Sequence, residues 1–267
     1  MFAAVPPVFA QNSDVVWGVS CCCGGVVTLI FALIAYHFLK DFEYGTPRTT
    51  PSVDEIAEQL PRKVSVTFRG EKVPEWKANP REQATKAVAK FLSYTDNWFD
   101  PKYLHEVADE AFRLVKDAIK DQTVQGVERR LTKDCLDELR AEIKKLRKER
   151  EARVFDKLLV TNVQVVQVEA PKGKDNHTFT ALITGKSRDY IVDDETGETV
   201  RGDKRVYLYQ EFYTFRRSEK RWLVELIRPS IDVDAVLGAK NVLAPIDFEE
   251  FAKDADPEHL KHVTPRG

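Results

Sequence analysis

Apolar and polar positions alternate between Tyr207 and Pro229, which predicts two β-strands joined by a charged turn at Arg216–Lys220. Both faces of this predicted hairpin carry apolar or aromatic side chains, so both faces need cover. We expect helices to cover one face and a pocket or a partner to cover the other. The residues expected at that pocket or partner contact are Tyr207, Tyr209, Glu211, Tyr213 and Trp222.

Helices precede this hairpin, and two more strands lie between them and it. Asp100-Pro101 is a helix-start signal, and the helix it opens runs to about Asp121. Thr132 is the expected cap of a second helix that runs to residue 153. Helices followed by an antiparallel meander predict an α+β domain in which a curved sheet wraps a long helix. The other expected elements are a helix at Arg81–Ser93, strands at Val64–Phe68, Val160–Ala170 and Thr178–Val192, coil at Asp232–Pro245, and a short helix at Asp247–Lys253.

A long apolar run, Val15–Leu39, contains no Asp, Glu, Lys or Arg and is long enough to cross a bilayer as a helix. Lysine and arginine follow this run but do not precede it, so the positive-inside rule places the larger C-terminal part in the cytoplasm. We therefore expect a single-pass protein of a bacterial inner membrane or an equivalent membrane. Val8–Ala10 also resembles the end of a signal peptide, although no basic region precedes it.

Three consecutive cysteines and two glycines lie inside the apolar run: Cys21, Cys22, Cys23, Gly24 and Gly25. Small residues at this position favour helix–helix packing in the membrane. Lipidation of the cysteines is the alternative interpretation. Cys135 is the fourth cysteine and stands alone, so the chain has no disulfide framework, which suits a reducing compartment for the main domain.

The predicted organisation has five parts. A short N-terminal segment, a membrane helix and a proline-rich linker with short helices precede an α+β domain and a C-terminal extension. Their boundaries are residues 1–14, 15–39, 40–97, 98–231 and 232–267.

The overall charge of the chain does not identify a class of partner. The chain has 31% charged residues and a net charge of −2, so its overall composition does not point to nucleic acid, and no DNA partner is expected. A local basic strip lies on the second predicted helix, at Lys144, Lys145, Arg147 and Lys148. Glutamates are interspersed with these residues, which favours a solvated helix face over a strip that binds anionic lipid or RNA.

Residues 98–231 resemble the domain shared by translocase of the inner membrane subunit 44 and its bacterial relatives. The features that carry this resemblance are the Asp100-Pro101 helix start, the Leu131-Thr132 helix start, and the aromatic hairpin from Glu211 to Arg217 with Trp222-Leu223-Val224 on its return strand. The resemblance implies a nuclear transport factor 2-like cone with a pocket at its open end. The chain differs from the mitochondrial import protein by its own membrane span, so it is more similar to membrane-anchored bacterial members of this Tim44-like family.

No catalytic, cofactor or metal motif is present: the sequence has no GxSxG, P-loop, HExxH or paired cysteine ligands. The resemblance implies a non-catalytic membrane-anchored adaptor or accessory subunit. Its expected partners are the membrane, other membrane-protein subunits, or a translocation or ribosome-related complex, and a homo-oligomer is an alternative. Two other functions stay open: a lipid- or small-ligand-binding cone domain at the membrane surface, and an enzyme that uses Glu211.

Overall fold

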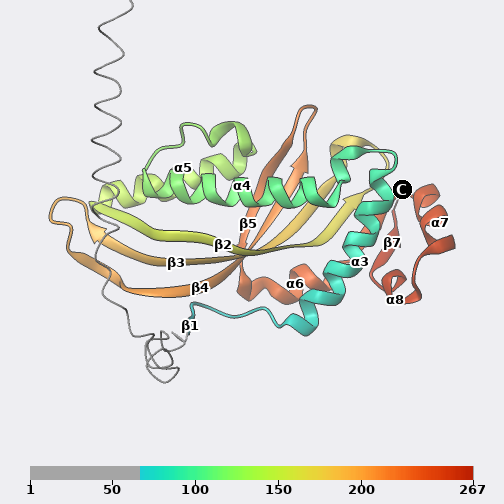
Figure 1. Ribbon diagram of the computed structural model, residues 1–267. Helices are drawn as coiled ribbons and strands as arrows, with labels where there is room; N and C mark the ends of the chain where they lie inside the picture. The colour runs from blue at the N-terminus through green and yellow to red at the C-terminus, as the bar shows by residue number, and fades with distance from the viewer. Residues whose placement is uncertain (1–66, 267) are drawn as a thin grey trace, which may run out of the picture. The chain divides into compact units, whose positions relative to one another are not determined.

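The computed structural model describes residues 67–266, in which a seven-stranded sheet is the central feature (Figure 1). Three long antiparallel strands form its middle: β2 (Glu151–Ala170), β3 (Thr178–Asp193) and β4 (Thr199–Arg217). Four shorter strands extend it: β1 (Thr67–Phe68) and β5 (Trp222–Pro229) on β4, β6 (Asn241–Leu243) on β2, and β7 (Val263–Pro265) on β6. This part of the chain is therefore α+β with a mainly antiparallel sheet, as the sequence predicts.

Within residues 67–266, three α-helices come before the long strands and three come after them. The caps that the sequence predicts are present. Asp100 accepts a hydrogen bond from the backbone N–H of Tyr103, and the Thr132 side chain caps the following helix through Cys135 N. The helices are α3 (Glu75–Ser93), α4 (Pro101–Lys120), α5 (Lys133–Glu149), α6 (Val233–Gly238), α7 (Pro245–Asp254) and α8 (Pro257–Leu260).

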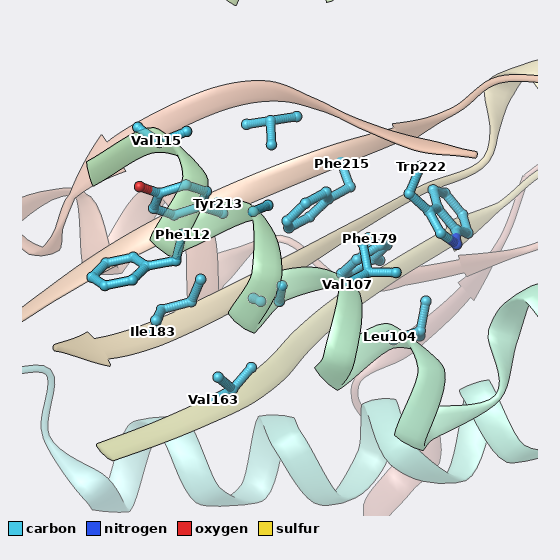
Figure 2. Packing of buried hydrophobic residues seen from close by; sticks show 14 of the residues in the cluster. Leu104, Val107, Phe112, Val115, Val163, Phe179, Ile183, Tyr213, Phe215 and Trp222 are labelled. Carbon is cyan, nitrogen blue, oxygen red and sulfur yellow. The ribbon is translucent and has the colours of Figure 1, made fainter. Parts of the chain in front are cut away.

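The main hydrophobic core lies between α4 and one face of the sheet (Figure 2). The buried stripe of α4 repeats at three and four residues, so one side of the helix is buried along its whole length and is apolar except at Lys116. Aromatic rings from the strands meet this stripe, and Phe179 and Phe215 stack with their ring centroids 4.3 Å apart. Residues of this core include Leu104, Val107, Phe112, Val115, Val163, Phe179, Ile183, Tyr213, Phe215 and Trp222.

The opposite face of the hairpin is covered by the chain itself. Phe212 is buried there with Leu182 and Val166, against α6 and the beginning of α3. The sequence predicts that both faces need cover, but we expected a pocket or a partner on the second face. The segment between Asp232 and Pro245, expected as coil, supplies part of the cover through α6, and it also contains β6.

The second predicted helix ends earlier than expected, and the first long strand begins earlier. Arg150 adopts a left-handed conformation with φ of 55°, which ends α5 at Glu149. Strand β2 then starts at Glu151, so Arg153 lies on a strand and not at the end of the expected helix. Periodicity alone did not reveal this boundary, because charged residues occupy both sides of it.

Several predictions concern the chain before Thr67. The expected membrane helix at Val15–Leu39, its Cys21–Gly25 motif and residues 40–66 of the linker lie outside the described residues. Within residues 67–266, no helix combines the length and the apolar character needed to cross a bilayer.

Candidate binding pocket

A gap along one edge of β4 forms the pocket that contains two of the predicted site residues. On this edge β1 pairs with Tyr207 and Leu208, while β5 pairs with β4 only from Glu211 onward. The two residues between these pairings face a hollow of about 340 Å³. We call it the Glu211 pocket; the polar side chains that line it are Arg69, Arg153, Asp189, Tyr209, Gln210, Glu211, Arg228 and Ser230.

Glu211 is held by a buried lysine from α4. Lys116 Nζ lies 2.7 Å from Glu211 Oε1, and the hydroxyl of Tyr213 lies 3.3 Å from Glu211 Oε2. The ammonium group also lies 5.2 to 5.5 Å from the ring centroids of Phe112, Phe155 and Tyr209, which favours a cation there. The carboxylate is therefore fixed in position and neutralised by its partner.

A second ion-paired group forms the neighbouring wall. Arg153 binds Asp189 through two hydrogen bonds of 3.0 Å, and Arg69 lies 3.0 Å from the same carboxylate. Burial opposes the charge of Asp189, but the two arginines outweigh it and keep its pKa below the ordinary value. Asp189 is therefore a carboxylate at neutral pH, and it orients both arginines at the pocket.

Tyr209 forms the inner wall, and a glycine makes room for it. Gly185 is the cross-strand partner of Tyr209, and a Cβ atom at residue 185 would lie only 2.8 Å from Tyr209 Cζ and 2.9 Å from Phe112 Cζ. Burial raises the pKa of Tyr209 above its ordinary value, so the phenol stays protonated. Its hydroxyl is buried and has no hydrogen-bond partner among the described residues.

The five predicted contact residues separate into two groups. Tyr209 and Glu211 line the pocket. Tyr207 lies beside it, with its ring centroid 5.0 Å from the guanidinium carbon of Arg69, and its hydroxyl donates to Asp203 at 2.6 Å. Tyr213 and Trp222 are fully buried in the main core (Figure 2). Trp222 lies edge-on to Phe179 and donates from its indole nitrogen to the backbone oxygen of Trp98, so the expectation of a surface contact is wrong for these two residues.

Sequence reasoning did not assign Lys116, Arg69 and Arg153 to this site. Lys116 has a signal in the sequence, because it lies four residues after Phe112 on the apolar stripe of its helix. A lysine in a core stripe needs a carboxylate partner, and Glu211 was the acid among aromatic residues. Arg69 and Arg153 have no comparable signal, because long-range strand pairing brings them to the pocket.

The other predicted site residues lie elsewhere or are not described. Lys144, Lys145, Arg147 and Lys148 are exposed on α5, and Arg147 donates to Gln122. Cys21, Cys22, Cys23, Gly24 and Gly25 lie outside the described residues. Within residues 67–266, no group of three or more His, Cys, Asp or Glu side chains is arranged to hold a metal ion.

Comparison with known proteins gives a family for the chain. No curated protein matches it. Among solved structures, it is similar to the crystal structure of the intermembrane space region of the chloroplast protein ARC6, with 12% sequence identity and a TM-score of 0.37, over 48% of this chain and 96% of that one. The model of the Tim44-like domain matches residues 85–227, which is more than half of the chain. The chain therefore belongs to the Tim44-like domain family.

Proposed function

We propose that this protein is a non-catalytic, membrane-anchored adaptor or accessory subunit that binds a protein partner or a membrane complex through its Tim44-like domain. The observation that carries the proposal is a Tim44-like domain that follows a 25-residue run without Asp, Glu, Lys or Arg. In this proposal Val15–Leu39 crosses the membrane once, the tether expected at residues 40–97 ends before α3, which packs on the sheet as part of the domain, and the domain is a nuclear transport factor 2-like cone on the cytoplasmic side.

The chemistry of the Glu211 pocket favours binding over catalysis. Each of its two carboxylates is tied to cations: Glu211 to Lys116, and Asp189 to Arg153 and Arg69. General acid–base catalysis near neutral pH needs a group that changes protonation there. Asp189 does not meet that need, because its pKa lies below the ordinary carboxyl value.

Extraction in mild detergent tests the adaptor function. We expect the full-length protein, purified from membranes and run on a size-exclusion column, to elute in a complex far heavier than its own 30.6 kDa plus the detergent micelle. Mass spectrometry of that peak then identifies the partner. Elution of the protein alone, at micelle-corrected monomer mass, contradicts the proposal.

A ligand-binding function is the second candidate, and the charges of the Glu211 pocket favour it. Three arginines line the pocket against two carboxylates, and Lys116 adds a further cation behind Glu211. This excess of cationic side chains favours the binding of an anionic lipid headgroup at the membrane surface. The full-length protein reconstituted in nanodiscs is expected to capture vesicles containing anionic lipid more than neutral vesicles, and high salt is expected to reduce the difference. Equal capture of both vesicle types contradicts this function.

A further inference from the structure

A second hollow lies between α3 and the C-terminal helices, away from the Glu211 pocket. It has a volume of about 620 Å³, and its apolar lining includes Phe91 on α3 and Phe251 on α7. These two rings pack edge to face with centroids 5.5 Å apart. Figure 1 shows α7 and α8 beside α3, and we call the hollow between them the α3–α7 groove.

The groove is preformed, because buried polar contacts fix the C-terminal extension to the domain. Arg81 of α3 is 3% exposed and donates to the backbone oxygens of Val166, Ala239 and His262. Asn241 accepts hydrogen bonds from Thr85 Oγ1 and from the backbone N–H of Val168. Buried hydrogen bonds of this kind hold α3, β2 and the extension in one arrangement.

One wall of the groove presents a large aromatic side chain to solvent. Tyr94, just after α3, is 77% exposed although it borders the groove. Exposed aromatic residues beside an apolar hollow are typical anchors of protein interfaces. Tyr94 and the half-buried Phe91 offer a surface for one apolar side chain of a partner, and the buried ring of Phe251 lies beneath them.

The opposite wall is acidic. Glu250 and Asp254 of α7 line the groove together with Asp256, against one lysine, Lys90 of α3. Neither Glu250 nor Asp254 forms an ion pair within the part of the chain that the structure describes. Asp254 is the last residue of its helix, where the helix dipole disfavours a carboxylate, so it does not stabilise α7. Residues 245–261 as a whole carry six acidic residues against two lysines. The surplus negative charge around an apolar floor calls for a cationic occupant.

We propose that the α3–α7 groove docks a basic peptide segment of the partner protein. An apolar side chain of that segment packs between Tyr94, Phe91 and Phe251, and its flanking Lys or Arg side chains pair with Glu250 and Asp254. This inference rests on the proposed adaptor function and names the chemistry of the segment that the adaptor holds. The acidic wall comes from α7, which lies beyond the residues matched by the Tim44-like domain.

A peptide titration of the full-length protein in detergent micelles tests the groove directly. The probe is a fluorescein-labelled 16-residue peptide of leucine, phenylalanine, lysine and arginine, and its control has glutamate in place of every basic residue. The groove variants are Tyr94→Ser and the double variant Glu250→Gln/Asp254→Asn. The matched control is Asp175→Asn/Glu219→Gln, which removes two exposed carboxylates outside the groove.

Fluorescence anisotropy is expected to show that wild type and the matched control bind the basic peptide equally, in a salt-dependent manner. Each groove variant is expected to bind it at least about fivefold more weakly, because a contact aromatic or a pair of rim charges is lost. The inference is wrong if the acidic peptide binds equally well, if the basic peptide does not bind, or if both groove variants retain wild-type affinity.

Size-exclusion of the extracted complex separates failure of this inference from failure of the proposed function. A heavy complex that forms with wild type and persists with both groove variants overturns the inference and leaves the adaptor function standing. A wild-type protein that elutes alone contradicts the adaptor function. In that case the peptide titration still decides whether the groove binds basic segments.

Discussion

The buried pair Lys116–Glu211 gives a quantitative test of how the Glu211 pocket is held together. The lysine side chain is 5% exposed and the glutamate side chain 21% exposed, so neither charge is well solvated. Lys116→Met keeps the packing against Phe112, Phe155 and Tyr209 but leaves the carboxylate without its partner. We expect this change to lower the free energy of unfolding by about 2–3 kcal/mol, because an unpaired charge remains in a partly buried site.

The reciprocal substitution, at Glu211, should lower the free energy of unfolding by a smaller amount. Glu211→Gln keeps a hydrogen-bond acceptor for Lys116, and the three aromatic faces still stabilise the ammonium group. We expect the free energy of unfolding to fall by about 1–2 kcal/mol. The double variant Lys116→Met/Glu211→Gln removes both charges, so it should lie within about 1 kcal/mol of wild type. The coupling energy of the two substitutions is then about 2–5 kcal/mol.

Urea unfolding of the full-length protein in detergent, followed by tryptophan fluorescence, measures all four species. The buried Trp222 makes the signal sensitive to the domain that contains the pair. A pair with no energetic coupling gives single-variant losses that add within about 0.5 kcal/mol in the double variant. That additivity would refute the reasoning, since it means that each side chain is accommodated without the other.

Three further predictions follow from the structure. Gly185→Ala should lower stability by about 1–2 kcal/mol in urea unfolding, because its Cβ would collide with Tyr209 and Phe112, whereas Gly238→Ala has open space and should change stability little. Burial lowers the pKa of His177 and of His262 below 6.5, so the unfolded chain binds protons at a higher pH than the folded protein does. The free energy of unfolding should therefore decline as the pH falls below 6.5, and the double variant His177→Gln/His262→Gln should flatten that decline. An unchanged pH profile of stability in the double variant would contradict this prediction. Cys135 is buried, and burial raises its pKa to about 11. In a variant in which Cys21, Cys22 and Cys23 are replaced by serine, a thiol reagent should therefore label Cys135 only after unfolding. Rapid labelling of the native protein would contradict the burial of Cys135.

Local signals in the sequence determined the class of fold and most of its elements. Asp100-Pro101 and Thr132 marked helix starts because capping depends on neighbouring residues only. Alternation identified β3, β4 and β5, because side chains on a strand point to opposite faces at every second residue. The same alternation showed that both faces of the β4–β5 hairpin must be covered.

Only the tertiary structure decided what covers each face and where the pocket lies. Alternation separates Tyr213 from Phe212 but does not say which face α4 takes, so Tyr213 and Trp222 were expected at a partner and are in the core. The Glu211 pocket depends on Lys116, Arg153 and Arg69, which come from three elements distant in sequence. Periodicity within one segment carries no information about such long-range pairings, whereas packing and the need to neutralise buried charge select them.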